Sequence, residues 1–123
     1  MWSTRIRGVA EAAGVGFRPV RNLEMLTARL ADSPVAALIL DLEAGEVCFD
    51  LLRILRTSTP AEQVQRIRVL AFAPHVAVDV MQRAIKEGAD VVLARGAFAR
   101  MMPDLLVKLS RGDISGLRSQ LTD

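Results

Sequence analysis

The sequence has few of the residues that build disulfides and metal sites. Its 123 residues include one cysteine, Cys48, and a single histidine. One cysteine cannot form an internal disulfide, and one cysteine with one histidine gives no cluster of metal-ligand spacing. The acidic neighbours Glu46 and Asp50 are expected to raise the pKa of the Cys48 thiol, which argues against a redox role. We interpret Cys48 as a small apolar residue of the core and predict no bound cofactor.

Long apolar runs are absent as well. The longest ones, such as Val35–Leu42, are far shorter than the roughly 20 residues that a transmembrane helix needs. The residues after Met1 lack the basic, apolar and small-residue order of a signal peptide. From these two absences we expect a cytoplasmic protein that does not bind a membrane.

Aromatic residues and an excess of one charge are also scarce. Aromatic side chains make up 4% of the chain, and its 16 basic and 14 acidic residues leave a net charge of +2. The basic residues are spread along the chain without a dense run, and few aromatic rings are present on which bases could stack. We predict no binding of nucleic acid by the chain itself.

What the chain does contain is enough apolar material for one core. Hydrophobic residues make up 51% of a length that is typical of a single domain. We expect this domain to cover residues 1–109. Residues 110–123 are expected to form a polar tail or a short helix.

Four short apolar segments predict strands: Val15–Val20, Val35–Leu42, Arg66–Phe72 and Asp90–Ala94. Pro19 cannot donate a ladder hydrogen bond, so the first of these is expected at a sheet edge. The second is continuously apolar, which is typical of a parallel strand covered on both faces.

Helical spacing of apolar residues predicts five helices. The first covers Ser3–Ala13, the second begins after the N-cap Asn22, the third covers Val47–Leu55, and the last begins near Pro103. The inward-facing residues of the fourth helix are expected to be Val76, Val80, Met81, Ala84 and Ile85.

Alternation of strands and helices predicts an α/β fold, in which a parallel sheet lies between two helical layers as a three-layer sandwich. Binding sites in such sheets lie at the carboxyl ends of the strands. Asp41, Ala73 and Arg95 each follow or end a predicted strand. We therefore expect these three residues to lie close together at the carboxyl ends of the strands.

Three passages resemble the receiver domains of bacterial response regulators. They are LILDLEAG, RVLAFAPHVAVDVMQRAIKEGAD, and DVVLARG with the helix that follows. The resemblance covers about residues 3–109, and RAIKEGAD running into VVLARG is its most specific part. It implies a flavodoxin-like topology and a role in two-component signal transduction. It also places Asp41 where the family's aspartate accepts a phosphoryl group.

Four features depart from the family's pattern. Its acidic pair, which holds a magnesium ion, follows a first strand that has no counterpart before Ser3. Ala73 stands at the position of the family's hydroxyl residue, Val92 at that of its aromatic residue and Arg95 at that of its lysine. Phosphoryl transfer depends on positioning and charge stabilisation. We therefore predict a pseudo-receiver that is not an enzyme, in which Asp41 is a structural carboxylate that pairs with Arg95 or caps a turn.

The absent first strand leaves three arrangements open. In the first arrangement, the strands Val15–Val20 and Val35–Leu42 pair directly. In the second, a partner supplies the strand, and in the third the strand is encoded upstream of Met1. An open gap would expose unpaired backbone groups and apolar side chains, which favours association.

The predicted function is a non-catalytic signalling module that binds protein partners, above all a second copy of itself. The expected interface lies on the fourth helix, the last strand and the last helix, and its candidate residues are Val91, Arg95, Phe98, Met101 and Met102. One alternative is a phosphorylatable receiver truncated at its N-terminus, which would bind Mg²⁺. Another is a flavodoxin-like domain that binds a small ligand.

Overall fold

A computed structural model describes residues 2–57 and 67–122 of the chain. Within them lies a three-stranded parallel sheet with the order β1-β2-β3. Its strands are β1 (Ala37–Asp41), β2 (Arg68–Ala73) and β3 (Val91–Ala94). The predicted α/β fold with a parallel sheet is confirmed, and three of the four predicted strands are present with ends that differ by at most two residues. The predicted start of the third at Arg66 lies outside the described residues.

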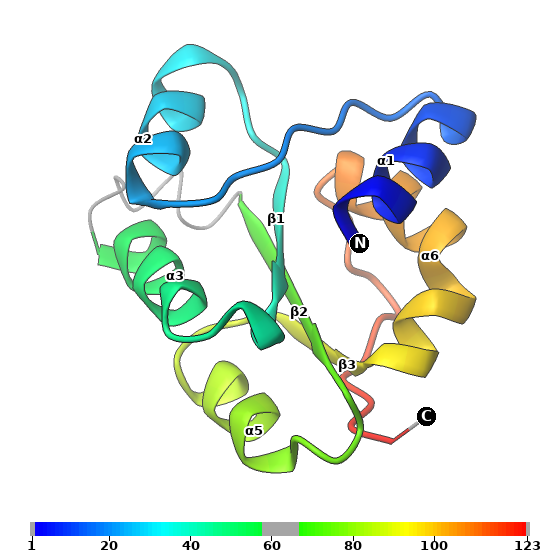
Figure 1. The fold of residues 1–123 in the computed structure, drawn as a ribbon. Helices are drawn as coiled ribbons and strands as arrows, with labels where there is room; N and C mark the ends of the chain where they lie inside the picture. The colour runs from blue at the N-terminus through cyan, green and yellow to red at the C-terminus, as the bar shows by residue number, and fades with distance from the viewer. Residues whose placement is uncertain (1, 58–66, 123) are drawn as a thin grey trace.

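Helices cover both faces of the sheet (Figure 1). On one face lie α2 (Leu23–Asp32), α3 (Val47–Thr57) and α5 (Val78–Lys86). On the other lie α1 (Trp2–Ala13) and α6 (Arg95–Ser110). None of the described helices is long and apolar enough to cross a membrane.

The sheet separates two apolar clusters. Leu52, Leu55 and Val69 lie in the cluster under α2, α3 and α5. On the opposite face, the rings of Phe72 and Phe98 stack with their centroids 4.3 Å apart. The strands are continuously apolar because each face of the sheet meets a helical layer.

The helix starts were predicted with mixed success. Asn22 caps α2 as expected, since its side chain accepts a hydrogen bond from the Met25 backbone N–H at 2.9 Å. The last helix was predicted to begin near Pro103, which is wrong: α6 begins at Arg95 and contains Pro103 in its interior. Proline removes one helical hydrogen bond, but α6 continues through it because residues on both sides of Pro103 are buried against the sheet.

The predicted inward face of the fourth helix is wrong for three of its residues. Val76, Val80 and Ile85 are exposed, whereas Met81 and Ala84 are fully buried. The helix, α5, begins only at Val78 and directs one narrow stripe to the sheet. The predicted inward face was counted from Val76. Because Val76 lies outside the helix, this count assigned the wrong residues to the face that meets the sheet.

Two segments outside the three strands also differ from the prediction. Val15–Val20 forms no strand. Residues 110–122 form no further helix beyond Ser110, and Gln120 instead makes an isolated parallel bridge to Leu93. The carboxyl-terminal tail therefore covers part of the outer edge of β3, which its polar composition did not indicate.

Arg56 joins α3 to the amino-terminal ends of β2 and β3. Its guanidinium donates to the Gly88 carbonyl at 2.8 Å, to the Ile67 carbonyl at 3.3 Å and to the Asp90 carboxylate at 3.0 Å. Gly88 has φ +115°, and a side chain there would meet Arg56 atoms at 3.3 Å. Glycine is thus required both by its backbone conformation and by the close approach of the guanidinium.

We predict that Arg56→Met lowers the free energy of unfolding by about 2 kcal/mol, because it leaves carbonyls and a partly buried carboxylate without their donor. Urea denaturation followed by circular dichroism measures this. Arg53→Met on the same helix removes only an exposed ion pair and is expected to change the value by about 0.5 kcal/mol or less. Equal effects of the two substitutions would contradict the structural role of Arg56.

Candidate functional site

Asp41 ends β1 and is held by its own following residues. Its carboxylate accepts a hydrogen bond from the Glu43 backbone N–H at 3.0 Å and caps the 3-10 helix η1 (Leu42–Ala44). The Asp41 carbonyl accepts a second hydrogen bond from the Cys48 thiol, with 2.9 Å between Sγ and O. The end of the strand is therefore fixed by short-range contacts to both its side chain and its backbone.

Burial raises the pKa of the Asp41 carboxyl above its usual range. The Glu43 backbone N–H and the charge of Arg95 lower the pKa, and the charge of Glu43 raises it, but desolvation has the largest effect. The ionised carboxylate is consequently less favourable in the folded chain than in the unfolded one. Desolvated carboxyl groups with a raised pKa occur at functional sites, and structural carboxyl groups can be perturbed as well.

Of the two structural roles predicted for Asp41, capping a turn is confirmed, whereas the ion pair with Arg95 is not formed. The Arg95 guanidinium instead pairs with the Glu43 carboxylate at 3.1 Å, and both side chains are about half exposed. Glu43 is on η1, directly beyond the end of β1, and so it meets the cation that was expected at Asp41. This ion pair is exposed and contributes little to stability.

The three predicted strand-end residues do lie together at the carboxyl ends of the strands. Asp41 pairs with Phe72 in the register of β1 and β2, and Ala73 pairs with Ala94, the residue before Arg95. Ala73 is buried and offers no hydroxyl group. The described residues include no group of three or more His, Cys, Asp or Glu side chains that could hold a metal ion.

Most of the predicted interface residues are not on the surface. Val91, Phe98 and Met102 are at most 2% exposed and belong to the core between the sheet and α6. Met101 is partly buried against the same core, and Arg95 is the exposed member of the set. The prediction is corrected for these three residues. Phe98 and Met102 are buried because α6 starts eight residues earlier than expected and turns them toward the sheet, and Val91 is buried because both faces of β3 are covered.

The Cys48 thiol is buried beside Asp41. Burial, followed by the charge of Asp41, raises its pKa to about 11. The expected direction is confirmed, but the cause is not the predicted charges of Glu46 and Asp50. At neutral pH the thiol is protonated and acts as a hydrogen-bond donor to the Asp41 carbonyl.

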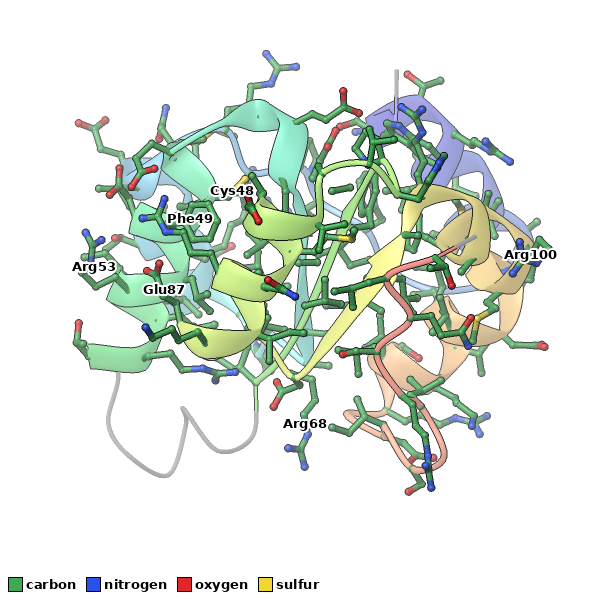
Figure 2. The ribbon with its side chains drawn as sticks, turned by 90° about the horizontal axis from the view of Figure 1, so that it is seen from below. Cys48, Phe49, Arg53, Arg68, Glu87 and Arg100 are labelled. Atoms are coloured by element: carbon green, nitrogen blue, oxygen red, sulfur yellow. The ribbon has the colours of Figure 1, made fainter. Side chains whose placement is uncertain are left out.

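Sequence reasoning missed a cluster around Arg83 of α5. Its guanidinium forms two hydrogen bonds to the Glu46 carboxylate, at 2.7 and 2.8 Å, and a further ion pair with Glu87. It also lies over the Phe49 ring, 3.8 Å from the centroid. Figure 2 shows Phe49 and Glu87 on the same side of the molecule, at α3 and the end of α5. The cluster joins the start of α3 to α5 and thereby supports the loop that follows Asp41.

A groove beside β1 was also missed. A cavity of about 780 Å³ follows the strand from Ala37 to Asp41. Its walls come from α1 and α6 on one side and from α2 and α3 on the other, and Val15–Val20 borders it. The sequence held one indication of this groove. The apolar segment Val15–Val20, which borders the groove, was predicted to lie beside the sheet, although it forms no strand.

We predict that Asp41→Asn raises the melting temperature at pH 7 by about 1–3 °C, since it removes a partly desolvated charge and keeps an oxygen for the Glu43 N–H. The raised pKa of Asp41 implies a destabilising effect that is absent below the usual aspartate pKa. The effect grows as pH rises through the raised pKa. The gain should therefore shrink toward zero as pH falls below this window, which calorimetry at a series of pH values measures.

Asp104→Asn on the exposed side of α6 serves as the control and should show no such pH-dependent gain. A lower melting temperature of Asp41→Asn at pH 7 would show instead that the carboxylate stabilises the fold.

Comparison with known proteins does not identify a family. No family model matches the chain, and no curated protein or solved structure shows significant similarity to it.

Proposed function

We propose that this chain is a non-catalytic regulatory module that acts in the cytoplasm by binding another protein. The observation that carries the proposal is the groove beside β1, in which a strand edge lies open between two apolar helical layers. An open edge of this kind is a template for pairing with another chain. The resemblance to receiver domains, including a flavodoxin-like topology, is consistent with a role in signal transduction.

The surroundings of Asp41 favour binding over phosphoryl transfer. Its carboxylate accepts a hydrogen bond from the neighbouring backbone, and Arg95, whose charge acts on Asp41, forms its ion pair with Glu43. Ala73 has no hydroxyl with which to contact a phosphoryl group. Transition-state stabilisation in phosphoryl transfer depends on charged and polar groups placed around the reacting atoms. The described side chains at the carboxyl ends of the strands offer few such charged and polar groups.

The alternative of a phosphorylatable receiver has a direct test. We predict that incubation with acetyl phosphate and Mg²⁺ leaves the mass of the intact protein unchanged, as measured by electrospray mass spectrometry at neutral pH. Asp41→Asn serves as the matched control. An added mass of one phosphoryl group in the parent chain, lost in Asp41→Asn, would contradict the non-catalytic proposal.

We retain self-association as part of the proposal, with different residues. Four large apolar side chains on α5 and the turn before it are exposed: Val76, Val78, Val80 and Ile85. We call them the α5 apolar surface. On α5, Val78, Val80 and Ile85 flank the buried stripe of Met81 and Ala84, and we propose that they take part in an interaction site. Their place next to β3 agrees with the predicted face, although the buried residues of that face do not contribute.

We predict that the average mass in size-exclusion chromatography with light scattering rises toward that of a dimer as the protein concentration increases. The double substitution Val76→Lys with Val80→Lys should keep the protein monomeric, because it places charges on the α5 apolar surface. Leu23→Lys changes an exposed apolar residue of α2 and should leave the mass unchanged. A parent chain that stays monomeric at every concentration would overturn this part of the proposal.

A further inference from the structure

The two edges of the sheet are not equivalent. At β3, the tail covers the outer edge: the Ala94 N–H donates to the Gln120 carbonyl at 2.6 Å, and the Gln120 N–H donates to the Val92 carbonyl at 2.9 Å. At β1, no described residue pairs with the outer edge. Backbone groups at a sheet edge are strong hydrogen-bonding groups whose partners must be accounted for.

The register identifies the backbone groups that point into the groove. The Ala36 carbonyl accepts a hydrogen bond from the Arg68 N–H of β2 at 3.1 Å. Backbone groups of successive strand residues point to opposite sides, so Leu38 and Leu40 also turn theirs toward β2. The N–H and C=O groups of Ala37 and Ile39 therefore face the groove, as a regularly spaced row of donors and acceptors.

The walls of the groove are apolar on both sides. Ile6 and Leu106 line it from α1 and α6, and Leu26 and Leu51 line it from α2 and α3. A strand that lies between two such walls needs apolar side chains on both of its faces. The five residues of β1 span roughly 17 Å, so the groove matches an extended segment of about the same number of residues.

One nitrogen of a guanidinium at the groove has no hydrogen-bond partner among the described residues. The Nε of Arg29 is buried and makes no hydrogen bond to any described residue. Arg29 lines the groove and lies near the end of α2, which only residues 33–36 separate from the start of β1. A buried donor without an acceptor is costly, and a carboxylate is the acceptor that would form the strongest hydrogen bond with it.

We propose that the groove binds an extended apolar strand of a partner protein, which pairs with β1 and places an acidic side chain against Arg29. This inference rests on the proposed function, since it specifies the chemistry of the partner. A strand satisfies the row of backbone groups that neither a helix nor an apolar small molecule satisfies. A second copy of the chain does not fit, because its own β1 edge is recessed between its helical layers.

Binding is tested on the full chain with a synthetic peptide of five consecutive valine and isoleucine residues, an aspartate at each end and a lysine-rich solubilising tail. Trp2 is the single tryptophan and lines the groove, where its ring lies edge-on to Phe72 at 5.0 Å. We expect a saturable change in its fluorescence. We also expect at least tenfold slower hydrogen exchange of the Ala37 and Ile39 amides, measured by NMR.

Two controls separate the parts of the proposal. A peptide with alternate backbone nitrogens methylated keeps its side chains but cannot pair, and it should not bind. Arg29→Met should weaken binding of the aspartate peptide about tenfold and leave binding of the matching asparagine peptide nearly unchanged. Arg100→Met changes an exposed arginine on the outer side of α6 (Figure 2), which does not line the groove, and should have no effect.

Each other outcome overturns the inference in a recognisable way. No saturable signal and no amide protection would show that the groove does not take a strand. Equal binding of the methylated peptide would identify an apolar small-molecule pocket. Protection that rises with protein concentration in the absence of peptide would identify a second copy as the occupant. A phosphorylated Asp41 would contradict the proposed function but leave strand binding intact, so the two failures are distinguishable.

Discussion

The structure depends on burying a parallel apolar sheet on both of its faces. β2 lies in the middle, paired on both edges, and its residues from Val69 to Ala73 are at most 1% exposed. Two helical layers are needed to cover such strands, which explains why the described helices lie on both faces of the sheet. Arg56 and Gly88 then fix the amino-terminal end of this arrangement, and the Asp41 turn forms its carboxyl-terminal end.

Covering both faces does not cover the edges. The tail supplies partners for β3, while the helical layers extend beyond β1 and form walls without a strand between them. The result is a groove whose walls are apolar and whose floor carries backbone groups that no described residue pairs with. Its polar and apolar parts are arranged in the pattern that an extended chain complements. This asymmetry, more than any single side chain, is the basis of the proposed binding function.

The Asp41 region shows how local contacts change the chemistry of a strand end. The resemblance to receiver domains suggested a carboxylate held by Arg95, but Glu43 lies closer to that arginine along the surface. Asp41 is left with a backbone hydrogen bond and a raised pKa, next to a thiol that is itself protonated. A charge that is neither paired nor fully solvated reduces stability, and perturbed carboxyl groups of this kind cluster at functional sites.

Strands were predictable where apolar residues were continuous, as in Val35–Leu42 and Asp90–Ala94, because only burial on both faces explains such runs. The Asn22 cap was predictable because it depends on a contact three residues away. Pro103 and Val76 misled, since a helix boundary is decided by which side chains the sheet buries. Because the start of α6 was misplaced, its buried residues Phe98 and Met102 were included in the predicted interface.

The sequence by itself determined the layer architecture and the place of Asp41 at the end of a buried strand, since both follow from the order and periodicity of apolar residues. Only the tertiary structure decided which partner Arg95 takes, which edge the tail covers and where the groove opens. These features depend on contacts between residues far apart in the chain, such as Arg95 with Glu43 and Gln120 with Leu93. Such contacts leave no periodic signal, because each involves one pair of residues and no repeating face.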